Sequence, residues 1–110
     1  FEDEPIMDII ELVEKLTPIY QIAFCTGRRE FVREKTEAWI RMHIRDLGGL
    51  SLLMRSNGDH RHDTEVKPEL LKQSGIHPVH FALILEDRNS MVKKWRELGF
   101  TCLQVADGDF

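Results

Sequence analysis

The chain has 110 residues, of which 42% are hydrophobic and 31% are charged, and its formal net charge is −4. This composition predicts one soluble, globular domain with a core of its own, and it excludes a disordered chain. The sequence contains no apolar run of membrane-spanning length and opens on no signal peptide pattern. Its negative charge argues against nucleic-acid binding through the whole surface.

The first half of the chain predicts two helices and two strands from the spacing of its apolar residues. These elements are expected over residues 6–16 (helix), 19–25 (strand), 30–47 (helix) and 50–54 (strand). Thr17-Pro18 ends the first helix and Gly48-Gly49 ends the second, because proline and glycine break helices. The triplet Thr26-Gly27-Arg28 then lies where a buried strand ends and a helix begins.

The second half of the chain predicts a polar loop followed by a strand–helix–strand unit. The expected elements are a loop over 55–64, a short helix over 68–73, a strand over 81–85, a helix that ends near Leu98, and a strand over 101–105. The expected N-cap of the helix that ends near Leu98 is Asn89 or Ser90. Gly99 ends the last of these helices, and its buried face is formed by Met91, Val92, Trp95 and Leu98. Helices that alternate with strands predict an α/β fold, a three-layer Rossmann-like arrangement with a mostly parallel sheet, over residues 1–110 as a single domain.

The cysteines indicate the cellular compartment, and the arginines indicate the charge of a possible ligand. Cys25 and Cys102 lie inside expected buried strands, which indicates buried thiols and not a disulfide, and fits a cytoplasmic protein. Cys25 is not the nucleophile of a cysteine phosphatase loop, because that loop needs an arginine six positions on and position 31 is phenylalanine. A local basic patch is available for a polyanion, formed by Arg28, Arg29, Arg33 and Arg55.

Two acids, Glu86 and Asp87, stand at the C-terminal tip of the strand expected over 81–85. Ligands of open α/β sheets bind at that edge, and paired carboxylates there can hold a hard cation such as Mg²⁺. The alternative interpretation is a solvated, charged turn.

Thr26, Gly27 and Arg28 bring together a hydroxyl, a glycine amide and a guanidinium at the expected start of a helix. This combination predicts a phosphate cradle, because helix N-termini attract anions and arginine binds phosphate through two hydrogen bonds. The alternative is that Thr26 is an ordinary helix N-cap.

Lys67 opens the expected short helix, where it is a candidate for neutralising a phosphate and a carboxylate nucleophile, or else an ordinary surface lysine. His60, His62 and Asp63 precede it in the polar loop. A zinc site needs three or four ligands, and no cysteine pair accompanies them. We therefore expect a solvated loop in which Asp63 is the functional candidate. No GxxxxGK[ST] motif occurs, so the sequence contains no nucleotide-kinase phosphate loop.

The hydroxyl of Thr26, then Lys67 and then the acid pair Glu86-Asp87 follow one another along the chain. In this order they resemble motifs two, three and four of the haloacid dehalogenase-like (HAD-like) phosphohydrolases. From about Tyr20 to Phe110 the chain is similar, more closely, to the 3′-phosphatase domains of phage polynucleotide kinase/3′-phosphatases. The stretches that carry this resemblance are FCTGRRE, GDHRHDTEVKPELL and LILEDRNSMVKKWRELGFTCLQVADGDF. Their most specific residues are Gly58-Asp59, Arg61, Asp63, Lys67, Asp87-Arg88, Trp95, 104–106 and 108–110.

The resemblance implies a substrate-binding group in the first half of the chain. Thr26 stands at the hydroxyl of motif two and would bind a non-bridging phosphate oxygen, with Gly27 in the same cradle. Arg28 would contact the phosphate or its nucleotide, and Arg55 would face the substrate.

The resemblance also implies catalytic and metal-binding residues in the second half. Lys67 would balance the charge of a phosphoaspartyl intermediate, and Asp63, four positions earlier, would orient it. Asp87 would hold Mg²⁺. Glu86, which departs from the aspartate expected at its position, would assist.

The motif that carries the family's nucleophile, DxDx[TV] at the end of a first strand, does not occur in this sequence. We therefore expect an upstream segment to supply that strand and its aspartate, and the strand to lie between the apolar runs 19–25 and 81–85. Without it, we expect these 110 residues to be inactive alone and not to fold stably, because unpaired buried backbone groups cost about 1–3 kcal/mol each and a domain is stable by only ~5–15 kcal/mol.

The function implied by the resemblance is a Mg²⁺-dependent phosphomonoesterase of DNA or RNA repair. It would remove 3′-phosphates from polynucleotide ends through an aspartyl-phosphate. Two alternatives remain: a phosphatase of the same superfamily for small phosphorylated metabolites or nucleotides, and a non-catalytic interaction module. The implied partners are nucleic-acid ends and a kinase domain in the parent protein, with no membrane, and a homo-oligomer is left open.

Overall fold

Helices and parallel strands alternate along the chain in the computed structural model, which describes residues 7–45, 47–79 and 82–110. The chain forms two compact units, one up to Asp59 and one from His60 onward. Residue 6 of the first expected helix and residue 81 of the third expected strand lie outside the described residues.

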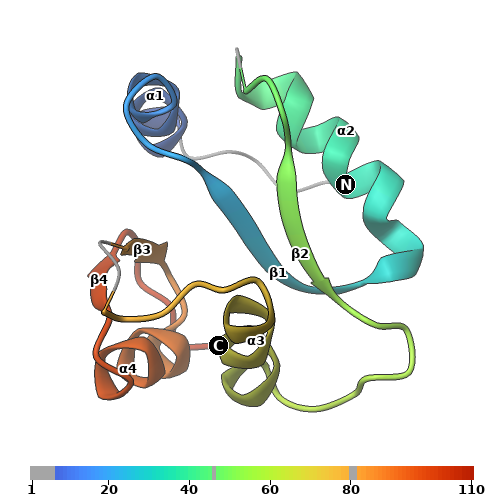
Figure 1. Cartoon of the computed structure of the whole chain (residues 1–110), viewed down its shortest axis with the longest axis vertical. Helices are drawn as coiled ribbons and strands as arrows, with labels where there is room; N and C mark the ends of the chain where they lie inside the picture. Colours follow the sequence, from blue (N-terminus) through green and yellow to red (C-terminus); the bar gives the residue numbers. More distant parts are fainter. Residues whose placement is uncertain (1–6, 46, 80–81) are drawn as a thin grey trace. The chain divides into compact units, whose positions relative to one another are not determined.

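The first unit is built from two helices and one pair of strands (Figure 1). Its elements are α1 (Met7–Leu16), β1 (Ala23–Arg29), the 3₁₀ turn η1 (Glu30–Val32), α2 (Arg33–His43) and β2 (Ser51–Arg55). β1 and β2 pair in parallel. Apolar side chains of the helices and of β2 form the core, which consists of Ile10, Ile40, Ile44, Leu52 and Met54. Leu52 and Met54 are two positions apart on β2, the spacing that places side chains on one face of a strand.

β1 begins and ends later than the apolar run 19–25 predicted. The amides of Ile19 and Tyr20 both donate to the carbonyl of Leu16, at 3.0 and 2.8 Å, so these residues continue the turn that ends α1, and their side chains are exposed. The strand starts after this turn and includes Thr26-Gly27-Arg28. The prediction that the triplet follows the strand and starts a helix is therefore wrong.

α2 is shorter than the helix predicted over 30–47, because η1 precedes it and it ends at His43. Ile44 already has an extended backbone, with φ −120° and ψ 119°, and its side chain joins the core. Around this stretch Ile40 is buried, and the side chains packed against the core include Val32, Trp39 and Leu47.

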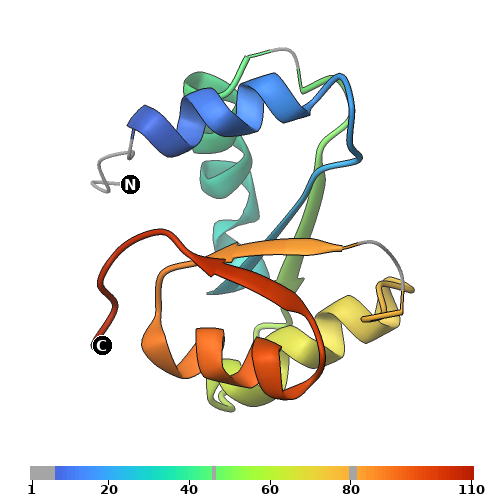
Figure 2. The same ribbon diagram turned by 90° about the vertical axis from the view of Figure 1, so that its left-hand side faces the viewer.

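The second unit has a strand–helix–strand arrangement (Figure 2). Its elements are α3 (Asp63–Gln73), β3 (Leu83–Glu86), α4 (Asn89–Glu97) and β4 (Thr101–Gln104). β3 and β4 are parallel, in a register that runs from Leu83 opposite Thr101 to Glu86 opposite Gln104. α4 packs against both strands, and α3 packs against α4. This unit confirms the predicted strand–helix–strand organisation.

α4 buries three of the four side chains predicted for its inner face: Met91, Val92 and Trp95. Leu98 is instead 40% exposed, because it is the C-cap residue beyond the last helical turn. Gly99 ends the helix as predicted, with φ 94°, and the next amide, that of Phe100, donates back to the carbonyl of Trp95 at 3.0 Å. Glycine is the favoured residue at a position with this left-handed conformation.

Both helices of the second unit begin at residues other than those predicted. α3 begins at Asp63 and contains Pro68 in its interior, because the imidazole of His62 caps the helix by accepting the amide of Thr64 at 3.2 Å. α4 begins at Asn89, but its N-cap is Arg88 and not Asn89 or Ser90. The consequence for α3 is that Asp63 and a lysine one turn later share a single helix.

The fold class is the predicted mixed α/β class with parallel strands. Among the described residues, β1 pairs only with β2, and β3 pairs only with β4. No helix within the described ranges is long and apolar enough to cross a membrane.

Candidate functional site

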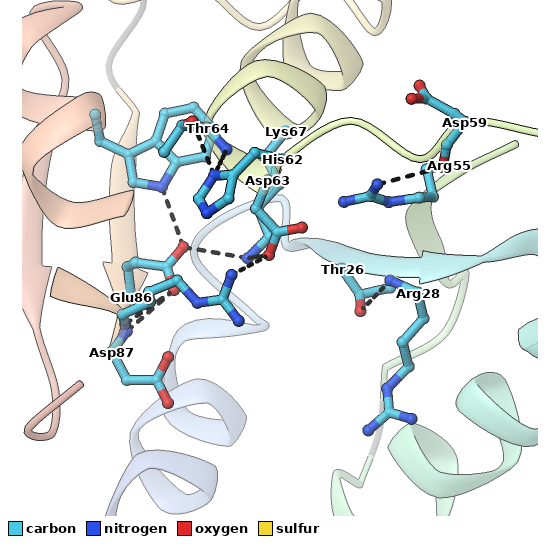
Figure 3. Close-up of polar contacts among 12 residues, drawn as sticks. Thr26, Arg28, Arg55, Asp59, His62, Asp63, Thr64, Lys67, Glu86 and Asp87 are labelled. Carbon is cyan, nitrogen blue, oxygen red and sulfur yellow. Dashed lines mark hydrogen bonds and ion pairs between the residues drawn. The ribbon is translucent and has the colours of Figure 1, made fainter. Parts of the chain in front are cut away.

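Two acids and a lysine of the second unit lie together where α3 begins and β3 ends (Figure 3). Nζ of Lys67 lies 3.4 Å from Oε1 of Glu86 and 4.0 Å from Oδ2 of Asp63, which precedes it by four positions on α3. All three side chains are largely buried, with exposed fractions of 12%, 10% and 15% for Lys67, Glu86 and Asp63. Lys67 is therefore an inward-facing lysine between two carboxylates, and the alternative of an ordinary surface lysine is wrong.

Glu86 is the hydrogen-bond acceptor around which this cluster is organised. Its Oε1 accepts from Lys67 and from the indole Nε1 of Trp95 at 3.2 Å. Its Oε2 accepts from the backbone amides of Asp87 and Arg88 at 3.2 and 3.4 Å. A carboxylate has about four lone-pair positions, and four donors of this chain lie on them. Glu86 thus holds the ammonium of Lys67, the indole of Trp95 and the backbone of the turn at 87–88 through hydrogen bonds.

Asp87 differs from its neighbour in the direction of its carboxylate, which points away from Glu86 (Figure 3). Within the described ranges this carboxylate makes no hydrogen bond or ion pair, and the residue is half-buried. No group of three or more His, Cys, Asp or Glu side chains suited to a metal occurs among the described residues. Mg²⁺ is commonly bound by one or two carboxylates together with water and substrate phosphate, so the oxygen donors of Asp87 fit that ion.

Arg88 completes the cluster, although the sequence pattern assigns it no contact. Its Nη1 donates to Oδ2 of Asp63 at 3.0 Å, so Asp63 lies between the cations of Arg88 and Lys67. Arg88 and Asp63 are 25 positions apart in sequence. The one local signal for their ion pair is that Arg88 directly follows two acids. The sequence pattern places Trp95 in the core but does not predict that its indole N–H donates to Glu86.

Thr26, Gly27 and Arg28 lie in the first unit, at a bulge near the end of β1. The strand pairing is regular up to Thr26 opposite Met54, and the next pair is Arg29 opposite Arg55. The amide of Arg28 donates to Oγ1 of Thr26 at 3.2 Å (Figure 3). A hydroxyl accepts and donates at once, so this contact leaves the hydroxyl hydrogen of Thr26 for an acceptor such as a phosphate oxygen.

The alternative that Thr26 caps a helix is wrong. The next helical turn, η1, begins at Glu30, and its N-cap is Arg29. A bulge of this kind is frequent beside functional sites, where it redirects a side chain.

The four arginines of the predicted basic patch have different environments. Arg28 is exposed, whereas Arg55 is only 8% exposed and its Nη1 donates to the carbonyl of Asp59 at 3.3 Å. Arg33 contacts both carboxylate oxygens of Glu30, at 2.6 and 2.8 Å, and also donates to the carbonyl of Leu52. The hydrogen bond between these two side chains lowers the pKa of Glu30 and raises the pKa of Arg33. Arg33 therefore joins the start of α2 to β2.

The histidines of the loop before α3 are both exposed, as expected for a solvated loop. His62 has a structural contact through Nδ1, which caps α3. Neither Cys25 nor Cys102 forms a disulfide, as predicted; Cys102 is buried as expected, whereas Cys25 is only half-buried.

Comparison with known proteins identifies the family. A family profile described as polynucleotide kinase PNKP phosphatase domain matches residues 1–110. A chain in a solved structure of the Pnkp1/Rnl/Hen1 RNA repair complex is 33% identical, with a TM-score of 0.84 over 99% of this chain and 35% of that chain. A second structure of the Pnkp1/Rnl/Hen1 complex matches at 31% identity and a TM-score of 0.81, over 99% of this chain and 38% of its own.

The chain therefore spans little more than a third of the length of these solved chains. Since the family profile covers every residue, the chain belongs to the HAD-like phosphatase-domain family of the polynucleotide kinase PNKP.

Proposed function

We propose that this chain is the phosphatase domain of a polynucleotide repair enzyme and that it removes 3′-phosphates from nucleic-acid ends. Membership of the phosphatase-domain family supports the reaction class. The observation that carries the assignment is the buried Lys67 between the carboxylates of Glu86 and Asp63, because a positioned cation stabilises the negative charge of a transferring phosphoryl group.

The proposed reaction has two steps. An aspartate carboxylate oxygen attacks the phosphorus, the bond to the 3′-oxygen breaks, and that oxygen takes a proton from a general acid and leaves as a hydroxyl. Water then gives a proton to the same group, now a base, and attacks the phosphorus; the aspartyl P–O bond breaks, which frees inorganic phosphate and the aspartate carboxylate. We propose that the attacking aspartate lies outside the 110 residues, since no DxDx[TV] motif occurs within them.

The residues of this chain have separate roles in that proposal. Thr26 donates its hydroxyl hydrogen to a phosphate oxygen, with Gly27 and Arg28 beside it in sequence, and Arg55 contributes positive charge. Lys67 balances the charge of the phosphoryl group while Asp63 and Glu86 hold its ammonium in place. Asp87 holds Mg²⁺, which when bound neutralises phosphate charge.

We further propose that the parent protein carries a kinase domain and works with other repair proteins in the cytoplasm. The solved chains that match are almost three times as long as this one and come from a complex with Rnl and Hen1. Cys25 and Cys102 form no disulfide in the described part of the chain, which suits a reducing compartment.

The test compares substrates on the full-length protein. An oligonucleotide with a 3′-phosphate should be hydrolysed faster than the same oligonucleotide with a 5′-phosphate and faster than a sugar phosphate. Added salt should slow the oligonucleotide reaction, because arginine contacts to a polyanion are screened. Equal rates for the sugar phosphate without a salt effect would favour a metabolite phosphatase. No hydrolysis of any of the three, in Mg²⁺, would favour a non-catalytic module.

A further inference from the structure

The segment 105–110, which follows β4, runs back along the turn that carries Asp87. The amide of Val105 donates to the carbonyl of Glu86 at 3.0 Å, and the carbonyl of Gly108 accepts the amide of Asn89 at 2.8 Å. These two hydrogen bonds hold the turn at both ends, since one lies before Asp87 and the other lies after Arg88.

A side chain at the end of β4 adds to these backbone contacts. Nε2 of Gln104 donates to the carbonyl of Asp87 at 2.9 Å and to Oδ1 of Asn89 at 2.6 Å. The main chain around Asp87 is therefore fixed by groups that come from a different part of the sequence and that take no part in the cluster of Glu86.

Gly108 approaches this turn so closely that no side chain fits. A Cβ atom there would overlap the carbonyl oxygen of Asp87 and lie 2.5 Å from its carbonyl carbon and 2.7 Å from Cα of Arg88. Gly108 is itself buried. Any larger residue must therefore displace the backbone of Asp87 or of the segment itself.

Phe110 contacts the same turn through a side chain. Its ring centroid lies 4.9 Å from Cζ of Arg88, within the range of a cation–π interaction. Arg88 in turn donates to Asp63, the partner of Lys67. Phe110 is 67% exposed, so its ring lies outside the core.

We propose that the segment 105–110 is a positioning element of the active site. Through Gly108 it sets the backbone of Asp87 and hence the direction of its carboxylate. Through Phe110 it holds Arg88 against Asp63 and so limits the movement of Lys67. This inference rests on the proposed function for its kinetic consequences, but the positioning itself is a property of the fold.

The first experiment uses Gly108→Ala in the full-length protein, with the neighbouring, exposed Asp107→Ala as the matched control. Gly108→Ala should raise the Mg²⁺ concentration for half-maximal rate by ~10-fold or more, the scale for groups that orient metal ligands. Gly108→Ala should also speed hydrogen exchange of the Asn89 amide, which donates to the carbonyl of Gly108. Asp107→Ala should change neither. An unchanged Mg²⁺ requirement together with unchanged Asn89 exchange in Gly108→Ala would overturn the proposal.

If Gly108→Ala does not fold, a second pair of variants tests whether the segment 105–110 positions the active site. Phe110→Leu removes the aromatic face and should lower kcat roughly two- to fivefold, the scale of one exposed cation–π contact, with KM and the melting temperature nearly unchanged. Phe110→Tyr keeps the ring and should restore kcat. Equal kcat for the leucine and tyrosine variants would contradict the role of Phe110.

Hydrogen exchange separates this inference from the proposed function. If the wild-type protein hydrolyses no 3′-phosphate but Gly108→Ala still releases the Asn89 amide, the function fails and the positioning element stands. If the wild-type protein is active and neither pair of variants has the expected effect, the function stands and the positioning element fails.

Discussion

The ammonium of Lys67 lies 3.4 Å from Oε1 of Glu86, the same oxygen that accepts the indole N–H of Trp95 at 3.2 Å. Trp95 is 2% exposed and cannot follow a moving carboxylate. The lysine, on a flexible stem, is the mobile partner, and its distances to Glu86 and Asp63 are at the long end for an ion pair. Glu86 therefore provides a fixed anchor from which Lys67 can reach a third negative group.

Replacing Lys67 by methionine should lower kcat by ~100-fold or more, the scale of removing one charge-stabilising group. Stability should change little, because Asp63 keeps Arg88 and Glu86 keeps three N–H donors. Lys72→Met, on an exposed position of the same helix, is the control. Phosphate release assays and thermal melts of both variants test this expectation, and wild-type turnover by Lys67→Met would remove Lys67 from the reaction.

Glu86→Gln should destabilise the protein by about 1–3 kcal/mol, the cost of leaving buried donors without an acceptor. The amide group of glutamine presents one oxygen, so either the donors on Oε1 or those on Oε2 lose their partner. A double-mutant cycle with Trp95→Phe, followed by denaturant unfolding, isolates the contact to the indole. Additive losses in the cycle would show that this contact contributes nothing to stability.

Asp87→Asn should abolish the effect of Mg²⁺ on the protein. A ligand that binds only the folded state raises its stability by RT ln(1 + [L]/Kd), so wild-type melting temperature should rise with added Mg²⁺ and that of Asp87→Asn should not. The fold should be intact, because this carboxylate has no partner within the described residues. Asp107→Asn is the control with the same change of charge. A Mg²⁺-dependent rise of equal size in both variants would place the ion elsewhere.

Glu30→Gln should reduce stability at neutral pH by up to ~1 kcal/mol, the range of exposed ion pairs. The hydrogen bond from Arg33 lowers the pKa of Glu30 in the folded protein, so its contribution is present above the ordinary value of ~4.3 and is lost as the pH falls through the folded value. The difference between wild type and variant should therefore vanish in acid. Glu34→Gln, at an exposed acid in the first turn of α2, is the control with the same change of charge.

Burial, and after it the negative charge of Glu86, raises the pKa of the Cys102 thiol, while Arg96 acts in the opposite direction. The folded state therefore holds this proton more tightly than the unfolded state, and the resulting stability is lost as the pH rises above ~8.5. Alkylation by iodoacetamide at pH 8 should be much slower for Cys102 in the folded protein than in denaturant. Equal rates would show that the thiol is accessible and unperturbed.

The elements of the fold could be read from the sequence wherever one local signal dominated. The spacing of Met91, Val92 and Trp95 with Gly99 after them fixed α4 at both ends within a residue or two. The start of β1 could not be read, because Ile19 and Tyr20 are apolar but remain in the turn after α1. Apolar character alone does not distinguish a strand from a turn that a preceding helix extends.

The candidate site was predictable in its members more than in its geometry. Lys67, Glu86 and Asp87 could be chosen by their position beside expected strand and helix ends. The interior position of Lys67 on α3 was missed because Pro68 is typical of a first helical turn, and the cap is an unusual histidine. The pairing of Arg88 with Asp63 depends on how α3 packs beside α4, which no local pattern contains.

The parallel pair β3–β4 has a practical consequence for anyone who prepares this protein. β3 has one strand neighbour among the described residues, and apolar side chains Leu83 and Leu103 on the two strands are about half exposed. An apolar strand with an open edge is a template for pairing with another molecule. Concentrated samples of these 110 residues should therefore associate through β3, and a lysine at position 83 would suppress that association by placing a charge on the exposed edge.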